Sequence, residues 1–597
     1  MIQSFFKRAA AGRPVYLTDV REAFQACGAR PFHLHVTLYD GTVRVFPLAL
    51  PRAVGEDEAE FLAGYVHAQL YNILSALGAA GVDVYLDWSD PALKRLGEGL
   101  EEVFQVHAAK EDRTGFGRCL NVNERVLAAL SGGGEKFTIR IFGIEDEPVV
   151  SEAPALTGSA PIFSRLPQRL RGRMVLGMDV GGTDVKLAVS ADGQLVLCKE
   201  FDWLPSACTR AEELTGPLLL LTRLLRAASS LHMADRAGEV NLRALERSAT
   251  LAEMEGAAER MERAAGADLR PLDAIGLSFP DVVIQNRIVG GETPKTQGLR
   301  SHPELDYEAQ FAKITGLNEA LAAFVRPGGP VLCVNDGPMA AFTAAVEQGA
   351  AGADLSKGFF VHTLGTDLGS GWARPDGSIP DIPLEVYNFI IDLGSWPGRT
   401  FPPEDVRSVR SLNTGLPGAL QKYGGQSAVF RLAAERLPRE APQVFQEALD
   451  RGLFRWEGDR LTVPTAPRDM RKDCLEFFMD RASQPGEEAC QDIFREIGEY
   501  LAVTWRETGY ILRPEAEDRT LFGRLVTRPA CFRLIQEGAA RREPGLRLLA
   551  ADGTLANTPL MKQLARWPGL TVAQFAQAVG AVYYGCLGLN GSNCQNA

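Results

Sequence analysis

The stretch MVLGMDVGGTDVKLAV, residues 174–189, decides the fold prediction. Its apolar start predicts a buried strand that delivers Asp179, a Gly-Gly-Thr turn follows at residues 181–183, and the apolar pattern then resumes as a second strand. Two glycines let a backbone approach an anion closely, and the N–H groups of a tight turn can hold phosphate oxygens. Asp179 would then lie where a magnesium ion bridges phosphates. On this stretch alone, an ordinary β-hairpin with a glycine-rich turn remains an equal alternative.

Two later stretches also predict a buried strand that leads directly into polar or glycine-rich residues. HTLGTDLGSGW, residues 362–372, predicts a second strand followed by a glycine-rich turn, which suits the opposite side of a phosphate chain. PVLCVNDG, residues 330–337, predicts a buried strand that ends in Asp336 and leads into a helix. An aspartate at such a strand end, between two phosphate-binding turns, can accept the proton of an attacking hydroxyl.

Composition limits the function classes. The chain has 597 residues, enough for two to four domains, and 46% of them are apolar, as in ordinary globular proteins. With 63 basic and 75 acidic side chains the net charge is −12, which disfavours a general nucleic-acid or anionic-membrane binder. The ten cysteines form no CxxC pair and no apolar run is long enough to cross a bilayer. We therefore expect a cytoplasmic, unprocessed protein with a small-molecule partner.

The composition and residue patterns divide the chain into three parts. Residues 1–150 predict an α+β domain of unknown role, with a hairpin at Asp40-Gly41 and a helix at 56–77. Residues 151–173 are rich in proline and arginine and predict a linker. The remaining 424 residues alternate strand-like and helical patterns, which is typical of an α/β protein.

In order along the chain, the three motifs resemble those of the superfamily that joins sugar kinases, actin and Hsp70 chaperones, and in particular hexokinases and bacterial ROK kinases. DVGGTDVKLAV, residues 179–189, resembles the first phosphate motif of both groups. LGTDLGSG, residues 364–371, resembles the second phosphate motif. VND, residues 334–336, is similar to hexokinase VNDT and ROK NDA, in which the aspartate is the catalytic base.

Further segments extend the resemblance on both sides of these motifs. LSFP, residues 277–280, resembles the hexokinase FSFP segment, and TPKTQG, residues 293–298, resembles a loosened WTKGF loop. LEVYNF, residues 384–389, is similar to hexokinase EWGAF and ROK GEIGH, whose glutamate binds sugar hydroxyls. LFGRL, residues 521–525, resembles the adenosine-side glycine motif. GLRLLAADGT, residues 545–554, resembles hexokinase RFLLSEDGSG, and VGA, residues 579–581, resembles the GAA of the closing helix.

The resemblance implies an α/β, two-lobed actin-like ATPase fold of the ribonuclease H-like type, preceded by the extra α+β domain. It implies a first lobe at 174–335 and a second at 336–597, with a C-terminal helix that is able to return to the first lobe. It further implies an ATP- and Mg²⁺-dependent kinase that phosphorylates a hydroxyl of a hexose or related sugar, with Asp336 as the general base.

The resemblance also assigns site residues. Those that would bind the ATP phosphates are Gly181, Gly182, Thr183, Lys186, Gly365, Thr366 and Gly369. Those on the adenosine side are Gly523, Gly553 and Gly580. Those that would contact the substrate are Ser278, Lys295, Thr296, Asn335, Glu385 and Asn388. Asp179 is the residue assigned to the metal.

Departures from the family pattern leave one alternative open. Asp367 stands where the second phosphate turn usually has glycine, and a carboxylate there repels phosphates. Pro294 interrupts the Thr-Lys pair of the sugar loop, and residues 390–410 lack the cysteines of the ROK zinc motif. A catalytically degenerate nucleotide or sugar sensor is therefore the alternative to a kinase. A DNA-binding repressor is disfavoured by the hairpin-containing N-terminal part, and an iron–sulfur activator by the lack of paired cysteines. The sugar, the hydroxyl and a homodimeric state stay open.

Overall fold

The structure is a computed structural model that describes residues 1–27, 30–131, 136–150, 162–290, 296–365, 368–395, 401–402, 405–411, 413–550 and 556–589. The chain forms two compact units, each assembled from separate segments. Unit 1 comprises Met1–Pro154, Val361–Ser370 and Ile382–Ala551, and unit 2 comprises Ala155–Phe360, Gly371–Asp381 and Asp552–Ala597. Within the described ranges, no helix is both long and apolar enough to cross a membrane.

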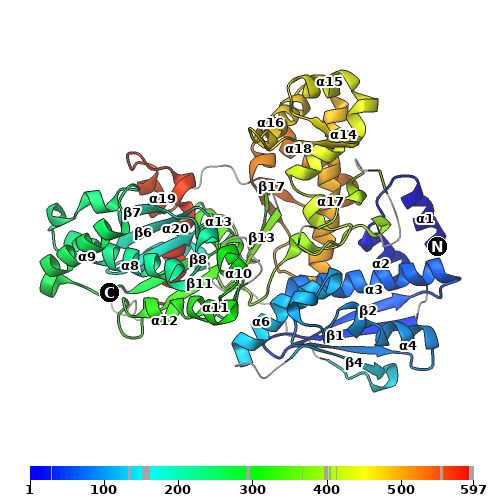
Figure 1. The fold of residues 1–597 in the computed structure, drawn as a ribbon, viewed down its shortest axis with the longest axis horizontal. Helices are drawn as coiled ribbons and strands as arrows, with labels where there is room; N and C mark the ends of the chain where they lie inside the picture. The colour runs from blue at the N-terminus through cyan, green and yellow to red at the C-terminus, as the bar shows by residue number, and fades with distance from the viewer. Residues whose placement is uncertain are drawn as a thin grey trace. The chain divides into compact units, whose positions relative to one another are not determined.

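Unit 2 is built on a five-stranded sheet with the order β11-β8-β5-β6-β7 (Figure 1). Its strands are β5 (Met174–Val180), β6 (Asp184–Ala191), β7 (Gln194–Asp202), β8 (Ala274–Phe279) and β11 (Val331–Asn335). β6 is antiparallel to both β5 and β7, whereas β8 is parallel to β5 and β11 is parallel to β8. An antiparallel meander of three strands followed by two parallel strands is the ribonuclease H-like order.

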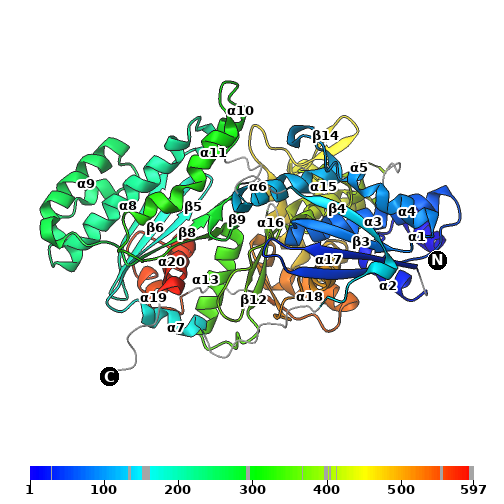
Figure 2. The same cartoon turned by 90° about the horizontal axis from the view of Figure 1, so that it is seen from below.

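Helices cover both faces of this sheet, and this explains why β5 and β8 are buried along almost their whole length. On one face, Met178 of β5 shares a core with Leu221 of α8 (Ala211–Met233) and Met254 of α9 (Leu251–Ala265) (Figure 2). The other face is covered by α20 (Val572–Gly585), which also packs against α13 (Asp336–Ala350). The remaining elements of unit 2 are α7 (Ile162–Arg169), β9 (Val283–Ile284), β10 (Arg287–Ile288), α10 (Gln297–Ser301), α11 (Tyr307–Thr315), α12 (Leu317–Ala322) and α19 (Pro559–Leu564).

Small residues bring α20 unusually close to the sheet and to α13. A Cβ atom added at Gly177 of β5 would overlap the carbonyl of Ala578, and one at Gly276 of β8 would overlap the carbonyl of Ala581. A Cβ at Gly580 would overlap the hydroxyl of Thr343 in α13. Because interiors are close-packed, each of these contacts needs a glycine. The chain thus returns at its C-terminal part to the unit that begins at residue 155.

A second sheet, mainly in unit 1, repeats part of this order. Its strands are β12 (Phe359–Leu364), β13 (Leu368–Ala373), β16 (Arg519–Phe522) and β17 (Leu548–Ala550), in the order β13-β12-β16-β17. β16 is parallel to both β12 and β17. This matches β6-β5-β8-β11 of unit 2, strand for strand. The two related sheets confirm the predicted α/β, two-lobed actin-like class.

Helices accompany the second sheet. They are α14 (Gln426–Glu440), α15 (Pro442–Asp450), α16 (Arg471–Ala482), α17 (Glu488–Leu512) and α18 (Pro529–Arg542), with a small hairpin of β14 (Arg455–Glu457) and β15 (Arg460–Thr462). α17 and α18 lie so close that side chains at Gly498 and Gly538 would overlap the backbone of the facing helix.

The N-terminal part of unit 1 is an α+β structure on a sheet of order β2-β1-β3-β4. Its elements are α1 (Ile2–Ala10), α2 (Leu17–Gln25), β1 (Arg30–Thr37), β2 (Val43–Leu50), α3 (Glu56–Leu77), β3 (Gly81–Leu86), α4 (Pro91–Glu98), α5 (Leu100–Val103), α6 (Cys119–Ser131) and β4 (Thr138–Gly143). The predicted hairpin is present as β1 and β2, and the helix predicted at 56–77 is α3.

Buried polar contacts tie this part to the helices of the second sheet within unit 1. The Arg21 guanidinium donates to the Glu507 carboxylate of α17 at 2.6 Å, and both side chains are almost inaccessible to solvent. The Asn72 amide of α3 donates to the same carboxylate at 3.1 Å and to the carbonyl of Ile390 at 3.0 Å. Because breaking a buried ion pair costs free energy, these contacts stabilise the packing of residues 1–150 against α17.

Candidate active site

Three parallel strands of unit 2 end beside one another and carry polar residues at that edge. In the strand register Asp179 of β5 pairs with Ser278 of β8, and Phe279 of β8 pairs with Asn335 of β11. Asp336 follows immediately as the first residue of α13. The carboxyl ends of parallel strands are where α/β folds bind ligands. We call Asp179, Ser278, Asn335 and Asp336 the acid edge.

Asp179 is a half-buried carboxyl group at this edge. Loss of hydration disfavours its charged form and raises its pKa from 3.8 to about 6. A hydrogen bond from Ser278 and the charge of Lys186 oppose this rise, and the charge of Asp336 adds to it. Two neighbouring carboxylates are hard oxygen donors that repel each other, so they fit a divalent cation such as Mg²⁺. Over the described ranges no cluster of three or more histidine, cysteine or acidic residues could hold a metal.

Asp336 lies in a tightly defined helix start. Asn335 is the N-cap of α13, and its side-chain oxygen accepts from the Gly337 amide at 3.1 Å. One Asp336 carboxylate oxygen accepts from the same amide at 2.8 Å. The Asn335 side-chain nitrogen donates to the Asp281 carbonyl at 2.6 Å, which fixes the chain that follows β8.

The first glycine turn is a tight connection between β5 and β6. The Gly181 amide donates to the Asp184 carbonyl at 2.8 Å, and the Gly181 carbonyl accepts from the Trp203 indole at 3.1 Å. A Cβ at Gly181 would lie only 2.8 Å from the Asp184 carbonyl oxygen, so the turn itself requires glycine there. Gly182 is partly exposed and Thr183 is exposed, so these two residues form the accessible part of the turn.

Lys186 pairs with Asp179 in the β5–β6 register and adds positive charge to this edge. Its ammonium group forms an ion pair with Asp184 and lies 3.9 Å from the Glu200 carboxylate. The lysine predicted to bind phosphate is therefore already partly neutralised by two carboxylates of the protein.

Gln577 is a residue of this site that the sequence analysis missed. It lies in α20, and its side-chain nitrogen donates to the Ser278 hydroxyl at 2.9 Å and to the Asp336 backbone carbonyl at 2.9 Å. Ser278 is fully buried. No sequence signal indicates Gln577, because it is separated from Ser278 by 299 residues and its role depends on how closely α20 packs.

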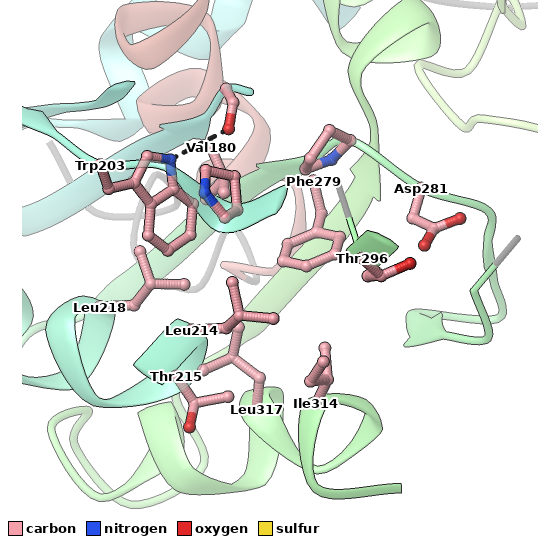
Figure 3. Close-up of a pocket in the computed structure, with 13 residues that line it drawn as sticks. Val180, Trp203, Leu214, Thr215, Leu218, Phe279, Asp281, Thr296, Ile314 and Leu317 are labelled. Atoms are coloured by element: carbon pink, nitrogen blue, oxygen red, sulfur yellow. Dashed lines mark hydrogen bonds between the residues drawn. The ribbon is translucent and has the colours of Figure 1, made fainter. Parts of the chain in front are cut away.

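An apolar pocket opens beside the first turn (Figure 3). The Trp203 N–H is occupied by Gly181 and the Thr215 hydroxyl donates to the Ala211 carbonyl at 3.2 Å, so both present apolar groups. Thr296, a predicted substrate contact, is buried and also lines it. The other lining residues are Val180, Gly181, Pro205, Leu214, Leu218, Phe279, Pro280, Asp281, Ile314 and Leu317. Lys295 lies outside the described residues.

The second glycine turn, in unit 1, is only partly described, because Thr366 and Asp367 lie outside the described residues. The Gly365 carbonyl accepts from the Gln426 amide at 2.9 Å, where α14 begins. Gly523 follows β16 with φ of +95°, and a Cβ there would overlap the carbonyl of Leu364. Unit 1 thus brings together Gly365 and the predicted adenosine-side Gly523. Gly369 lies in β13.

The other two predicted adenosine-side glycines are not seen beside Gly523 in the described residues. Gly553 lies outside the described residues. Gly580 is buried in the middle of α20, where it permits the contact with Thr343 of α13.

Glu385 and Asn388, predicted to contact sugar, also belong to unit 1. The Glu385 amide donates to the Ser75 carbonyl at 3.1 Å, and the amide of Leu384, whose φ is +54°, donates to the Ala76 carbonyl at 3.0 Å. The Asn388 side-chain oxygen accepts from the Asn413 side-chain nitrogen at 3.5 Å. The segment is thus held by the C-terminal end of α3, which belongs to the N-terminal α+β part.

No protein-family model and no curated protein sequence matches the chain. Among solved structures, a ROK family glucokinase from Streptomyces griseus in complex with glucose and AMPPNP is similar, with 16% identity, a TM-score of 0.36, and coverage of 68% of this chain and 98% of its own. A ROK hexokinase from Thermus thermophilus has 17% identity, a TM-score of 0.37, and coverage of 69% and 97%. A glucokinase from Leishmania braziliensis has 13% identity, a TM-score of 0.36, and coverage of 71% and 97%. These values are low, so the fold class follows from the strand orders of the two sheets.

Proposed function

We propose that this protein is an ATP- and Mg²⁺-dependent kinase that phosphorylates a hydroxyl of a hexose or related sugar. One observation carries the proposal: Asp336 stands at the end of a buried parallel strand, at the start of a helix, and close enough to Asp179 for their charges to interact. A carboxylate in such a position is suited to proton transfer beside a phosphate chain.

In the proposed reaction Asp336 is the general base. The acceptor hydroxyl oxygen forms a bond to the γ-phosphorus of ATP as the bond from that phosphorus to the bridging oxygen breaks, and ADP leaves. The hydroxyl proton passes to the Asp336 carboxylate. Asn335 keeps the helix start in place through its bonds to the Gly337 amide and the Asp281 carbonyl, so the base is oriented before substrate arrives.

The phosphate-binding roles are divided between the two glycine turns. Gly182 and Thr183 would contribute the accessible amides and hydroxyl of the first turn, and Gly365, Thr366 and Gly369 those of the second. Asp179 would hold Mg²⁺, which when bound supplies positive charge that offsets the phosphate oxygens. The remaining substrate contacts proposed are Lys295, Thr296, Asn335, Glu385 and Asn388. Ser278, predicted as a further contact, is fully buried and would act on Asp179 instead.

We further propose a supporting role for the N-terminal α+β part. The segment that carries Glu385 donates two backbone hydrogen bonds to the end of α3, at the carbonyls of Ser75 and Ala76. A binding segment held by a helix end loses less conformational entropy on binding than a free loop. Residues 1–150 would therefore act as a scaffold for one side of the sugar site.

A nucleotide or sugar sensor without turnover is the second candidate. It is favoured by the ion pair of Lys186 with Asp184 and by its proximity to Glu200, because a lysine so neutralised attracts phosphate less strongly. The two candidates predict different outcomes for the same assay.

The test is ADP release from Mg·ATP in the presence of a panel of hexoses, hexosamines, N-acyl hexosamines and polyols. ATP binding is measured separately by calorimetry. A kinase shows ADP release that depends on one or a few of these acceptors, with formation of the phosphorylated sugar. ATP binding without acceptor-dependent ADP release across the whole panel would contradict the kinase proposal and support the sensor.

A further inference from the structure

Gln577, in the helix α20 near the C-terminal part of the chain, forms hydrogen bonds with two residues of the acid edge, Ser278 and Asp336. An amide NH₂ group has two N–H donors, and the Gln577 nitrogen lies 2.9 Å from the Ser278 hydroxyl oxygen and 2.9 Å from the Asp336 carbonyl oxygen. Both donors are therefore used within the site. Its side chain is half-buried.

The orientation of the Gln577 amide follows from its surroundings. A backbone carbonyl can only accept a hydrogen bond, so the group that faces the Asp336 carbonyl must be the NH₂ and not the oxygen. With one N–H on that carbonyl, the other points to the Ser278 oxygen. Ser278 thus accepts from Gln577, which leaves its single hydroxyl proton for its hydrogen bond to the Asp179 carboxylate.

The reach of Gln577 depends on the close packing of α20. Gly177 and Gly276 let this helix lie on the backbones of β5 and β8, and the carbonyl that would collide with a side chain at Gly177 is that of Ala578, the neighbour of Gln577. The glycines in the two strands and the glutamine in the helix therefore act together.

We propose that Gln577 is a positioning residue for phosphoryl transfer, because it orients Ser278 toward Asp179 and fixes the first turn of α13 that carries Asp336. This inference rests on the proposed function. It adds to that function a residue in the last helix of the chain, which acts through Ser278 and the Asp336 backbone without contacting substrate.

The central variant is Gln577→Met, which keeps the length and much of the volume of the side chain but removes both donors. We expect kcat to fall about 10- to 100-fold, because small displacements of a positioned base are costly. We expect KM for ATP and for sugar to change less than about twofold, since no substrate contact is removed.

Gln574→Met is the matched control. Gln574 lies one turn earlier in α20, and its amide donates to Glu200 at 2.5 Å. We expect its kcat to stay within about twofold of wild type, and its melting temperature to match that of Gln577→Met. A fall in kcat that is equal in both variants, or that follows a loss of melting temperature, would overturn the positioning role.

A double-mutant cycle with Ser278→Ala separates positioning from packing. If Gln577 acts through Ser278, the kcat losses of the two single variants overlap, and the double variant loses clearly less than their product. Fully multiplicative losses would contradict this route.

A crystal structure of Gln577→Met gives a readout that does not depend on turnover. The expected result is a displaced Asp336 side chain or first turn of α13, with Ser278 rotated away from Asp179. An unchanged acid edge would overturn the inference even if wild-type protein phosphorylates sugar. A wild-type protein without turnover would instead contradict the proposed function, and the structural readout would still decide the role of Gln577.

Discussion

The two sheets share a strand order, but the residues at the carboxyl ends of their parallel strands differ. In unit 2 the parallel strands deliver Asp179, Ser278 and Asn335, followed by Asp336. In unit 1 the corresponding strands, β12 and β16, lead into Gly365 and Gly523.

Glycines without side chains can only contribute backbone groups and close approach, whereas carboxylates can move protons and hold cations. Under the proposed function, the carboxyl ends of the unit 2 strands would supply the base and the metal ligand, whereas Gly365 and Gly523 would supply only backbone groups.

The largest expected effect is on Asp336, the proposed base. Asp336→Asn keeps the shape of the side chain but removes the base, so we expect kcat to fall about 10³-fold, within the range usual for a general base. ATP binding and the melting temperature should stay near wild type. The measurement is sugar-dependent ADP release at saturating substrates.

Asp354→Asn, on the exposed segment after α13, is the control for that substitution, and its kcat should be unchanged. Retention of more than about a tenth of wild-type kcat by Asp336→Asn would remove this residue from the role of base.

The glycines that follow a central parallel strand in each sheet, Gly181 after β5 and Gly523 after β16, should differ in what their substitution costs. Gly523→Ala places a side chain at φ of +95° against Leu364, so we expect the free energy of unfolding to fall by about 2–3 kcal/mol. Gly181→Ala meets the Asp184 carbonyl at 2.8 Å without a positive φ, so the loss should be about 1 kcal/mol, with a raised KM for ATP.

Chemical denaturation measures both variants. Gly64→Ala, in the middle of α3 with open space around it, is the control and should raise stability by about 0.5–1 kcal/mol. Equal losses at Gly181 and Gly523 would show that the two glycines are under the same constraint, contrary to the comparison.

A pH dependence of stability is expected from Asp179. Its pKa is raised from 3.8 to about 6 in the folded protein, so the folded state binds this proton more tightly than the unfolded state. The resulting stability is present below about pH 4 and is lost as pH rises to about 6. Asp179→Asn should therefore lose less stability than wild type between pH 4 and pH 6, measured by denaturant unfolding at several pH values. Parallel pH curves for the two proteins would contradict the assignment.

Local features of this fold could be predicted from the sequence. The β5–β6 turn, the strand that ends at Asp336 and the bounds of α3 depend on patterns within about 20 residues, and each is present in the structure. Glycine turns and apolar runs produce such signals because they act on the backbone at short range.

Long-range contacts could not be predicted in the same way. The Arg21–Glu507 ion pair joins the N-terminal part to α17, and the contact of Gln577 with Ser278 depends on the packing of a distant helix. The proximity of Lys186 to Glu200 depends on the pairing of β6 with β7, whereas its ion pair with Asp184 joins two residues on one face of β6. Each of these features changes how the site is interpreted, although none alters the fold class.

The most direct test of the account is a crystal structure of the protein with Mg²⁺, a non-hydrolysable ATP analogue and the sugar that supports the fastest ADP release. We expect one sugar hydroxyl to lie within hydrogen-bond distance of the Asp336 carboxylate and in line with the γ-phosphorus. We also expect Asp179 to contact the metal or its water shell. A sugar bound away from the acid edge, or a hydroxyl positioned by another residue with Asp336 turned aside, would contradict the central claim.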